Sequence, residues 1–311
     1  MPLRALVLSG GGAKGAFQVG ALDTLLNEQG LEFAIIAGVS TGALSAGLLA
    51  QGAGGPGQRA ELEGVKELYF SITSNRDVQR TRFLGLLGAF LFHDSIFDPA
   101  PLRNELFQRI DPARLRASGT ALRVGAVCLE DGRYRAVTQD DPHIREFIFA
   151  SASMPVFWPP EEIDGRHWVD GGVRNVTPLR DAIQALHALR QRSPTAPDDP
   201  DEMWVVLASP LDTPPESGGL GTALPILKRT IEILEGEIYR GDFAGYLARH
   251  RGPARTPPLR LRVILPTEVF SGALEFDPAK IRRAYESGRE RARVPLDEAA
   301  LGRIIARDGA P

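Results

Sequence analysis

A serine flanked by glycines, in Gly38-Val39-Ser40-Thr41-Gly42, is the first group in this sequence that could do chemistry. The pattern G-x-S-x-G is typical of a nucleophile elbow, a sharp turn between a strand and a helix that exposes the serine hydroxyl. The apolar run at 33–37 predicts a buried strand before the turn, and the small and apolar residues at 43–50 predict a helix after it. The motif therefore lies in the setting that its mechanics require, and we expect Ser40 to be a nucleophile.

A second glycine-rich segment could stabilise the charge that such a nucleophile creates. Gly10-Gly11-Gly12-Ala13-Lys14-Gly15 follows the apolar run at 5–8 and precedes a predicted helix at 16–29. Consecutive glycines let backbone N–H groups approach a ligand closely, and the N-terminus of the following helix adds positive potential. We expect the N–H groups of Gly10, Gly11 and Gly12 to form an oxyanion hole.

The same segment also fits G-x-G-x-x-G, the pattern of a dinucleotide-binding loop. That site needs an acidic residue at the end of the next strand, about 20 residues further on. Here Glu32 precedes the second predicted strand, and that strand runs into Ser40. Lys14 also lacks the G-K-[ST] ending of a phosphate-binding P-loop. Nucleotide binding is therefore the less favoured alternative.

The third segment is an aspartate followed by two glycines, Asp170-Gly171-Gly172. A carboxylate at a strand end next to glycines projects into a cleft without steric cover. The alternative is an ordinary Asp-Gly hairpin turn, which is the interpretation we favour for Asp131-Gly132. Because it accompanies the other two glycine-rich segments, Asp170 becomes the candidate base.

In this order the three segments resemble the patatin-like phospholipases, whose motifs are G-G-G-x-[KR]-G, G-x-S-x-G and D-G-G followed by N-x-x-P. The resemblance runs from about residue 3 to residue 178, continues weakly over 276–293, and includes 97–102 and 150–160. It implies a three-layer α/β/α fold with a mostly parallel central sheet, and a Ser–Asp dyad without histidine. It also implies that Ser40 is the nucleophile and Asp170 the base. The glycines at 10–12 would form the oxyanion loop, and the motifs would be supported by Lys14, Gly15, Gly38, Gly42, Gly171 and Gly172.

The five histidines bear on the mechanism independently. A Ser-His-Asp enzyme of the α/β-hydrolase type needs a histidine after the acid, and only His187 and His250 follow Asp170. His187 belongs to an amphipathic helical pattern, and His250 lies in an arginine-rich run. His167 is close to Asp170 in sequence, but residues of one extended strand do not converge on one reacting atom. A triad stays an alternative, and the sequence favours the dyad.

The expected reaction is the cleavage of a carboxyl ester through an acyl-Ser40 intermediate. Asp170 would accept the Ser40 proton, protonate the leaving alcohol and later activate water. Since a carboxylate is a weak base at its ordinary pKa of about 3.9, it must work in a shielded cleft. The implied substrate is a phospholipid, a lysophospholipid or another hydrophobic ester. An acyltransferase that uses the same serine is the alternative enzyme.

The composition is that of an ordinary enzyme, with 43% hydrophobic and 24% charged residues. The net charge of -3 gives no basic field for nucleic acid. The single cysteine, Cys128, lies in an apolar strand pattern, and no Cys/His cluster has metal-ligand spacing, so we expect neither metal nor cofactor. No apolar stretch reaches the ~20 residues of a membrane span, and the first strand begins too early for a signal peptide. We therefore expect a cytoplasmic protein.

The chain begins with a βαβα pattern, which predicts a parallel sheet with helices on both faces. We expect a single domain over 1–311, with a motif-bearing core at about 3–210 and a C-terminal extension at about 211–311. Further predicted elements are a hairpin at 121–138, strands at 203–208 and 260–265, helices at 59–70, 220–248 and 278–293, and loops at 52–58 and 191–202.

The segment 83–92 is apolar on all sides and follows Arg76, Arg80 and Arg82. A buried core helix is the favoured interpretation of so short an apolar run. The alternative is a cap over the acyl channel that makes a peripheral membrane contact, with the arginines meeting lipid phosphate. Met154, Phe157 and Trp158 are expected to line the acyl pocket.

Overall fold

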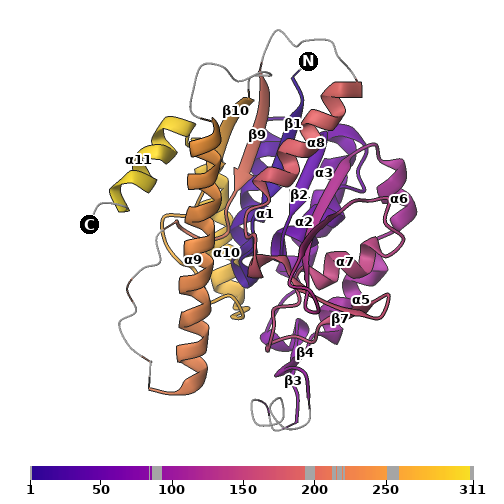
Figure 1. Cartoon of the computed structure of the whole chain (residues 1–311), viewed down its shortest axis with the longest axis vertical. Helices are drawn as coiled ribbons and strands as arrows, with labels where there is room; N and C mark the ends of the chain where they lie inside the picture. The colour runs from indigo at the N-terminus through magenta and orange to yellow at the C-terminus, as the bar shows by residue number, and fades with distance from the viewer. Residues whose placement is uncertain are drawn as a thin grey trace.

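A mixed sheet of eight strands forms the centre of the computed structural model (Figure 1). Its strands are ordered β10-β9-β1-β2-β5-β8-β7, and β6 pairs with β5. The neighbours from β10 to β5 are parallel, whereas β6, β7 and β8 pair antiparallel. The strands are β1 (Arg4–Leu8), β2 (Ile35–Gly38), β5 (Ala121–Cys128), β6 (Tyr134–Val137), β7 (Glu161–Ile163), β8 (Arg166–Asp170), β9 (Asp201–Val206) and β10 (Leu259–Ile264). The structure describes residues 2–83, 85, 93–192, 200–211, 215, 219, 221–250 and 259–308.

Helices join and cover these strands. They are α1 (Gly15–Asp23), α2 (Thr41–Leu49), α3 (Gly54–Phe70), α5 (Ala100–Arg109), α6 (Pro112–Ala117), α7 (Ile144–Ala150), α8 (Leu179–Arg192), α9 (Ala223–His250), α10 (Pro278–Ala292) and α11 (Glu298–Asp308). A π-helical turn, Thr24–Glu28, extends α1. A separate two-stranded ribbon of β3 (Arg80–Thr81) and β4 (Phe97–Asp98) lies at the end of the molecule opposite the N-terminus (Figure 1). Among the described residues, no helix combines the length and apolar character needed to cross a membrane.

The alternation of side chains along the strands creates two hydrophobic layers. In β1, Leu6 and Leu8 point into a core shared with residues of α1, α2, α3, α7 and α10. Ala5 and Val7 point to the other face, into a core shared with residues of α8, α9 and α11. The sheet is therefore covered on both sides, and the expected three-layer α/β/α fold is confirmed.

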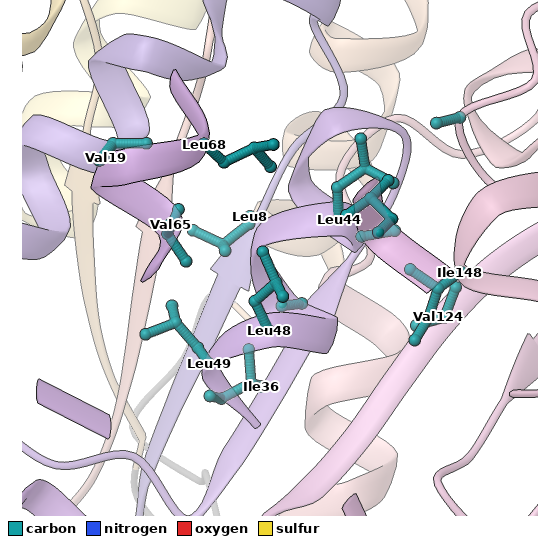
Figure 2. Packing of buried hydrophobic residues seen from close by; sticks show 14 of the residues in the cluster. Leu8, Val19, Ile36, Leu44, Leu48, Leu49, Val65, Leu68, Val124 and Ile148 are labelled. Atoms are coloured by element: carbon teal, nitrogen blue, oxygen red, sulfur yellow. The ribbon is translucent and has the colours of Figure 1, made fainter. Parts of the chain in front are cut away.

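Helix α2 is fixed against the sheet by its leucines, as Figure 2 shows. Leu44, Leu48 and Leu49 are buried and belong to the same core as Leu8, Ile36, Val65, Leu68, Val124 and Ile148. Burial of one leucine side chain contributes about 1.5–3 kcal/mol. Because α2 begins directly after Ser40, this packing fixes the position of the serine relative to β1 and β2.

The C-terminal extension is packed tightly against the start of the chain. A Cβ at Gly20 of α1 would lie 1.8 Å from the carbonyl oxygen of Tyr285, and one at Gly288 of α10 would lie 2.0 Å from that of Phe17. Glycine at both positions lets the backbones of α1 and α10 touch. Strand β10 also joins the central sheet, so the extension belongs to both its helical and its strand layers.

Most of the predicted elements are present, with the strands at 5–8, 33–37, 203–208 and 260–265 and the hairpin at 121–138 close to their expected bounds. The predicted loop at 52–58 is wrong, because α3 begins at Gly54. The carboxylate of Glu32 accepts the Gly55 N–H at 2.9 Å and so stabilises a first turn that its glycines disfavour. Helix α11 was not predicted. Residues 84 and 86–92 of the apolar segment, and 193–199 of the second predicted loop, lie outside the described residues.

Candidate active site

Ser40 has an unusual backbone conformation, with φ 57° and ψ -129°. Such a conformation costs a residue with a side chain about 1–3 kcal/mol and is found mainly at functional sites. Its glycine neighbours allow the turn to be this tight. A Cβ at Gly38 would lie 2.3 Å from the carbonyl oxygen of Gly42, and one at Gly42 would lie 2.3 Å from that of Leu8. The chain thus turns from β2 into α2 in the manner expected of a nucleophile elbow.

A second serine, Ser151, holds this strained turn. The Ser40 N–H donates to the Ser151 hydroxyl oxygen at 3.0 Å, and that hydroxyl donates to the carbonyl of Gly125 at 2.6 Å. Ser151 is fully buried, so loss of its hydroxyl would leave two polar backbone groups without this partner. Sequence reasoning assigned Ser151 no role beyond its place in the segment 150–160 that resembles the family. A serine directly after the apolar stretch 147–150 was the available signal.

Asp170 is the last residue of β8 and is held through both its backbone and its side chain. Its N–H donates to the carbonyl of Ser153 at 3.0 Å, and its Oδ1 accepts the N–H of Gly172 at 2.7 Å. A Cβ at Gly171 would lie 2.3 Å from the carbonyl oxygen of Gly125, so only glycine fits there. Asp170 Oδ2 is buried and has no hydrogen-bond partner among the described residues. One carboxylate oxygen is therefore free to take a proton.

Burial raises the pKa of Asp170 to about 7, although hydrogen bonding by the Ser40 hydroxyl and the Gly172 N–H lowers it. The negative charge of Glu235 raises this pKa further. Ser40 and Asp170 line the same pocket, but the unpartnered Oδ2 means that their contact is looser than an ordinary hydrogen bond. Catalytic hydrogen bonds are often long until substrate binds. A carboxyl group with a pKa near neutrality is a much better proton acceptor than one in water.

The oxyanion loop differs in one respect from the expectation that Gly10, Gly11 and Gly12 all supply donors. The Gly10 N–H already donates to the carbonyl of Val176 at 3.0 Å. The N–H groups of Gly11 and Gly12 have no hydrogen-bond partner within the described part of the chain. These two donors are therefore available, whereas the Gly10 N–H is engaged.

Both available donors lie where a larger residue would not fit. A Cβ at Gly11 would lie 2.4 Å from that of Ala208, and one at Gly12 would lie 2.0 Å from the carbonyl oxygen of Ala273. Gly12 also has φ +59°, which disfavours any side chain. The loop is thus enclosed by the residues that follow β9 and by the C-terminal extension.

The remaining residues of the loop motif are buried next to the same site. Lys14 is 6% exposed, and its charge lowers the pKa of Glu235, which burial raises. A Cβ at Gly15 would lie 2.3 Å from the hydroxyl of Tyr69 and 2.4 Å from that of Thr41. Gly15 therefore allows the loop to pack against the first residue of α2.

Ser40 and Asp170 open into an apolar pocket with about 620 Å³ of empty space, part of it open to solvent. The pocket is lined by Gly12, Ser40, Thr41, Leu44, Leu68, Tyr69, Ile72, Val78, Leu102, Ala152, Met154, Trp158, Asp170, Ala273, Leu274 and Phe276. Met154 and Trp158 lie in this apolar pocket as expected, whereas Phe157 lines a neighbouring pocket. Ala273 and Leu274 form part of the wall of the apolar pocket without any signal in the sequence, because the fold of the extension brings them here, whereas Phe276 lies at the start of the weak resemblance at 276–293.

No histidine lines the apolar pocket among the residues that the structure describes. His167 is exposed, and its Nδ1 lies 2.8 Å from Glu130 Oε1. His143 pairs with Asp164 at 3.2 Å, and His187 is exposed on α8. Nor does the described part of the chain contain a group of three or more His, Cys, Asp or Glu that could hold a metal. Glu32, the acidic residue considered for a nucleotide ribose, is engaged at the start of α3.

A family model agrees with the motifs. Residues 6–183 match the family model described as patatin-like phospholipase. Among solved structures, VipD from Legionella pneumophila is similar with a TM-score of 0.44 and 15% identity, covering 94% of this chain and 66% of that one. The ExoU–SpcU complex of the Pseudomonas aeruginosa type III secretion system has a TM-score of 0.36 and 18% identity, covering 98% and 52%. This chain thus spans about half to two thirds of those chains. The comparison with curated proteins found no match.

Proposed function

This chain belongs to the patatin-like phospholipase family, and we propose that it is a serine acyl hydrolase that cleaves carboxyl esters of lipids. The observation that carries the proposal is the pairing of a strained serine with a buried carboxyl group in one apolar pocket. Ser40 is the proposed nucleophile and Asp170 the proposed base. The apolar lining suits an acyl chain, which would be bound by burial of its methylene groups.

In the proposed reaction, Asp170 Oδ2 takes the proton of the Ser40 hydroxyl while Oγ attacks the ester carbonyl carbon. The carbonyl oxygen gains a negative charge, which the N–H groups of Gly11 and Gly12 stabilise. The bond to the leaving alcohol then breaks, and Asp170 returns the proton to that alcohol. A water molecule next gives a proton to Asp170 and attacks the acyl-Ser40 carbonyl. When the bond from the acyl carbon to Oγ breaks, Asp170 returns this proton to Oγ, so that the free acid leaves and both Ser40 and the Asp170 carboxylate are restored.

A neighbouring pocket, which shares Met154, Ala273 and Leu274 with the apolar pocket, would receive the alcohol part of the substrate. It is more polar, since Asn75, Lys228, Glu232, Glu235 and Glu275 contribute to its lining. A phospholipid or lysophospholipid combines an apolar chain with a polar head group, and so matches the two pockets together. An acceptor alcohol in the same place would turn hydrolysis into acyl transfer.

The proposal is tested with intact-mass analysis after treatment with a fluorophosphonate, together with release of fatty acid from a lysophospholipid. One adduct on Ser40 and a loss of more than about 1,000-fold in turnover for Ser40→Ala are expected, because the nucleophile itself is removed. A Ser45→Ala variant, altered on the same helix, should label normally. Labelling elsewhere, or activity in Ser40→Ala within tenfold of the parent, would refute the proposal. Glycerol as acceptor separates the two enzymes, because an acyltransferase would form its ester instead of free acid.

We also propose a peripheral membrane contact at the β3–β4 end of the molecule. Phe83 lies two residues after β3 and is 79% exposed. Its insertion into lipid would contribute roughly 1.5–3 kcal/mol, or one to two decades in binding. Phe83→Asp should weaken co-sedimentation with phospholipid vesicles and spare turnover of a soluble ester. Unchanged co-sedimentation would refute the contact.

A further inference from the structure

Helix α9 lies outside the residues that match the family model, yet one of its faces is directed at the candidate active site. Glu235, Tyr239 and Asp242 have the spacing i, i+4 and i+7, which places them on one side of the helix. Figure 1 shows α9 as a long helix that runs beside the sheet. Each of the three residues acts on a different segment of the site.

Tyr239 contacts the oxyanion loop directly. Its hydroxyl donates to the carbonyl oxygen of Gly10 at 2.5 Å and lies 2.9 Å from the hydroxyl oxygen of Ser9. The side chain is 1% exposed, and this burial raises the pKa of its hydroxyl, which therefore keeps its proton. Tyr239 is thus a fixed hydrogen-bond donor at the back of the loop.

The other side of Gly10 is held as well. Its N–H donates to the carbonyl of Val176 at 3.0 Å, and the next residue, Thr177, donates its N–H to Asp242 Oδ2 at 3.0 Å. Helix α9 therefore fixes the carbonyl of Gly10 directly through Tyr239. It fixes the segment that receives the Gly10 N–H through Asp242.

We propose that Tyr239 is a positioning residue that aims the Gly11 N–H at the developing oxyanion. The Gly10 carbonyl and the Gly11 N–H belong to one planar trans peptide, in which the C=O and N–H bonds point in opposite directions. A carbonyl held on the α9 side therefore directs the N–H away from α9. The adjacent Cα of Gly10 is close to the nucleophile, since a Cβ there would lie 3.2 Å from Ser40 Cβ.

This inference rests on the proposed function, because it assigns a role within acyl transfer. The Ser9 hydroxyl also donates to the Gly10 carbonyl, at 3.0 Å. Glycine peptides rotate easily, so with this single bond and without the Tyr239 hydroxyl the Gly10–Gly11 peptide would sample more orientations in which its N–H misses the oxyanion. Loss of one complete oxyanion donor costs about 100- to 1,000-fold in kcat. A donor that is misaligned only part of the time costs less, so we expect a loss of about 10- to 100-fold in kcat with KM little changed.

The experiment compares Tyr239→Phe with Tyr246→Phe on a p-nitrophenyl ester, at a temperature well below the melting temperature of either variant. Tyr246 is also buried on α9 and lies two turns further along, so its variant removes a buried tyrosine hydroxyl from the same helix and should match the parent in kcat. Affinity for a boronic acid, which forms a tetrahedral adduct with the serine, should fall in Tyr239→Phe by the same factor as kcat/KM. Incorporation of 4-aminophenylalanine at position 239 restores a donor and should recover most of the rate.

Several results would overturn the inference. They are a kcat for Tyr239→Phe within twofold of the parent, an equal loss in Tyr246→Phe, unchanged boronic acid affinity, or no recovery with 4-aminophenylalanine. A parent enzyme that leaves every ester intact would refute the proposed function and this inference with it. A parent that hydrolyses esters beside an unaffected Tyr239→Phe variant would refute the inference alone.

Discussion

Replacement of Asp170 by asparagine should remove catalysis and make the protein more stable at alkaline pH. In the folded protein burial raises the pKa of Asp170 to about 7, whereas its ordinary value is 3.8. Between these two values the folded state binds more protons than the unfolded state, so the free energy of unfolding falls as pH rises. The contribution of the neutral carboxyl is fully present below about pH 4 and is lost as the pH passes through about 7. Asparagine has the same shape and never ionises.

The size of the effect follows from the difference of about three pH units between the two pKa values. Each unit corresponds to about 1.4 kcal/mol, so an ionised Asp170 lowers the free energy of unfolding by ~4 kcal/mol at pH 8. At pH 5 the cost is under about 2 kcal/mol, because the folded carboxyl is still protonated. With an unfolding entropy of about 2 cal/mol/K per residue, the gain for Asp170→Asn is about 6 °C in Tm at pH 8 and about half of that at pH 5.

Thermal melts of the parent, Asp170→Asn and Ser40→Ala at both pH values provide the measurement. Ser40→Ala is the matched control, since it is also expected to be inactive but keeps the buried carboxyl group. Its hydroxyl lowers the pKa of Asp170, so its removal should not raise Tm at pH 8. An Asp170→Asn variant with a Tm at or below that of the parent at pH 8, or with the same gain at both pH values, would refute the reasoning.

Three further predictions concern the surroundings of the dyad. The pH profile of kcat/KM should rise to a plateau as Asp170 ionises near pH 7. Glu235→Gln should move this rise to lower pH, because the charge of Glu235 raises the pKa of Asp170, and a profile that does not move would contradict this reasoning. Ser151→Ala should lower both Tm and kcat, because the buried Ser40 N–H would lose its partner at a cost of about 1–3 kcal/mol. A variant with the Tm and kcat of the parent would show that Ser151 does not stabilise the turn at Ser40. His167→Ala and His187→Ala should each keep at least half of the ester turnover, and a loss comparable to that of Asp170→Asn would favour a triad.

The groups proposed to react could be predicted from the sequence because each sits in a locally encoded turn. Gly38 and Gly42 are required by the close approach of their own and neighbouring backbones, which a G-x-S-x-G pattern makes readable. Gly171, which follows Asp170, is likewise required, because a Cβ there would lie 2.3 Å from the Gly125 carbonyl oxygen. The parallel strands before the two glycine segments are also encoded locally, as short apolar runs.

What the sequence could not provide depends on contacts between distant segments. The Gly10 N–H donates to the carbonyl of Val176, which is far away in the chain, and no local pattern reveals this bond. The sequence therefore predicted three equivalent oxyanion donors, whereas only two N–H groups of the loop are available among the described residues. The glycines at the start of α3 have low helix propensity, so the sequence predicted a loop there. The helix nevertheless begins at Gly54, because the carboxylate of Glu32, outside the helix, accepts the Gly55 N–H. The wall at Ala273 belongs to a segment without any recognisable pattern.

These long-range contacts bear directly on whether a carboxylate can replace histidine as the base. In water an aspartate is ionised at neutral pH but accepts a proton poorly. The Ser–Asp motif alone would not raise its pKa. Burial of Asp170 and the charge of Glu235, which comes from α9, bring its pKa to about 7. The same helix supplies Tyr239 to the oxyanion loop. The basicity of the proposed dyad and the proposed orientation of its oxyanion donors therefore both depend on α9, a helix outside the residues that match the family model.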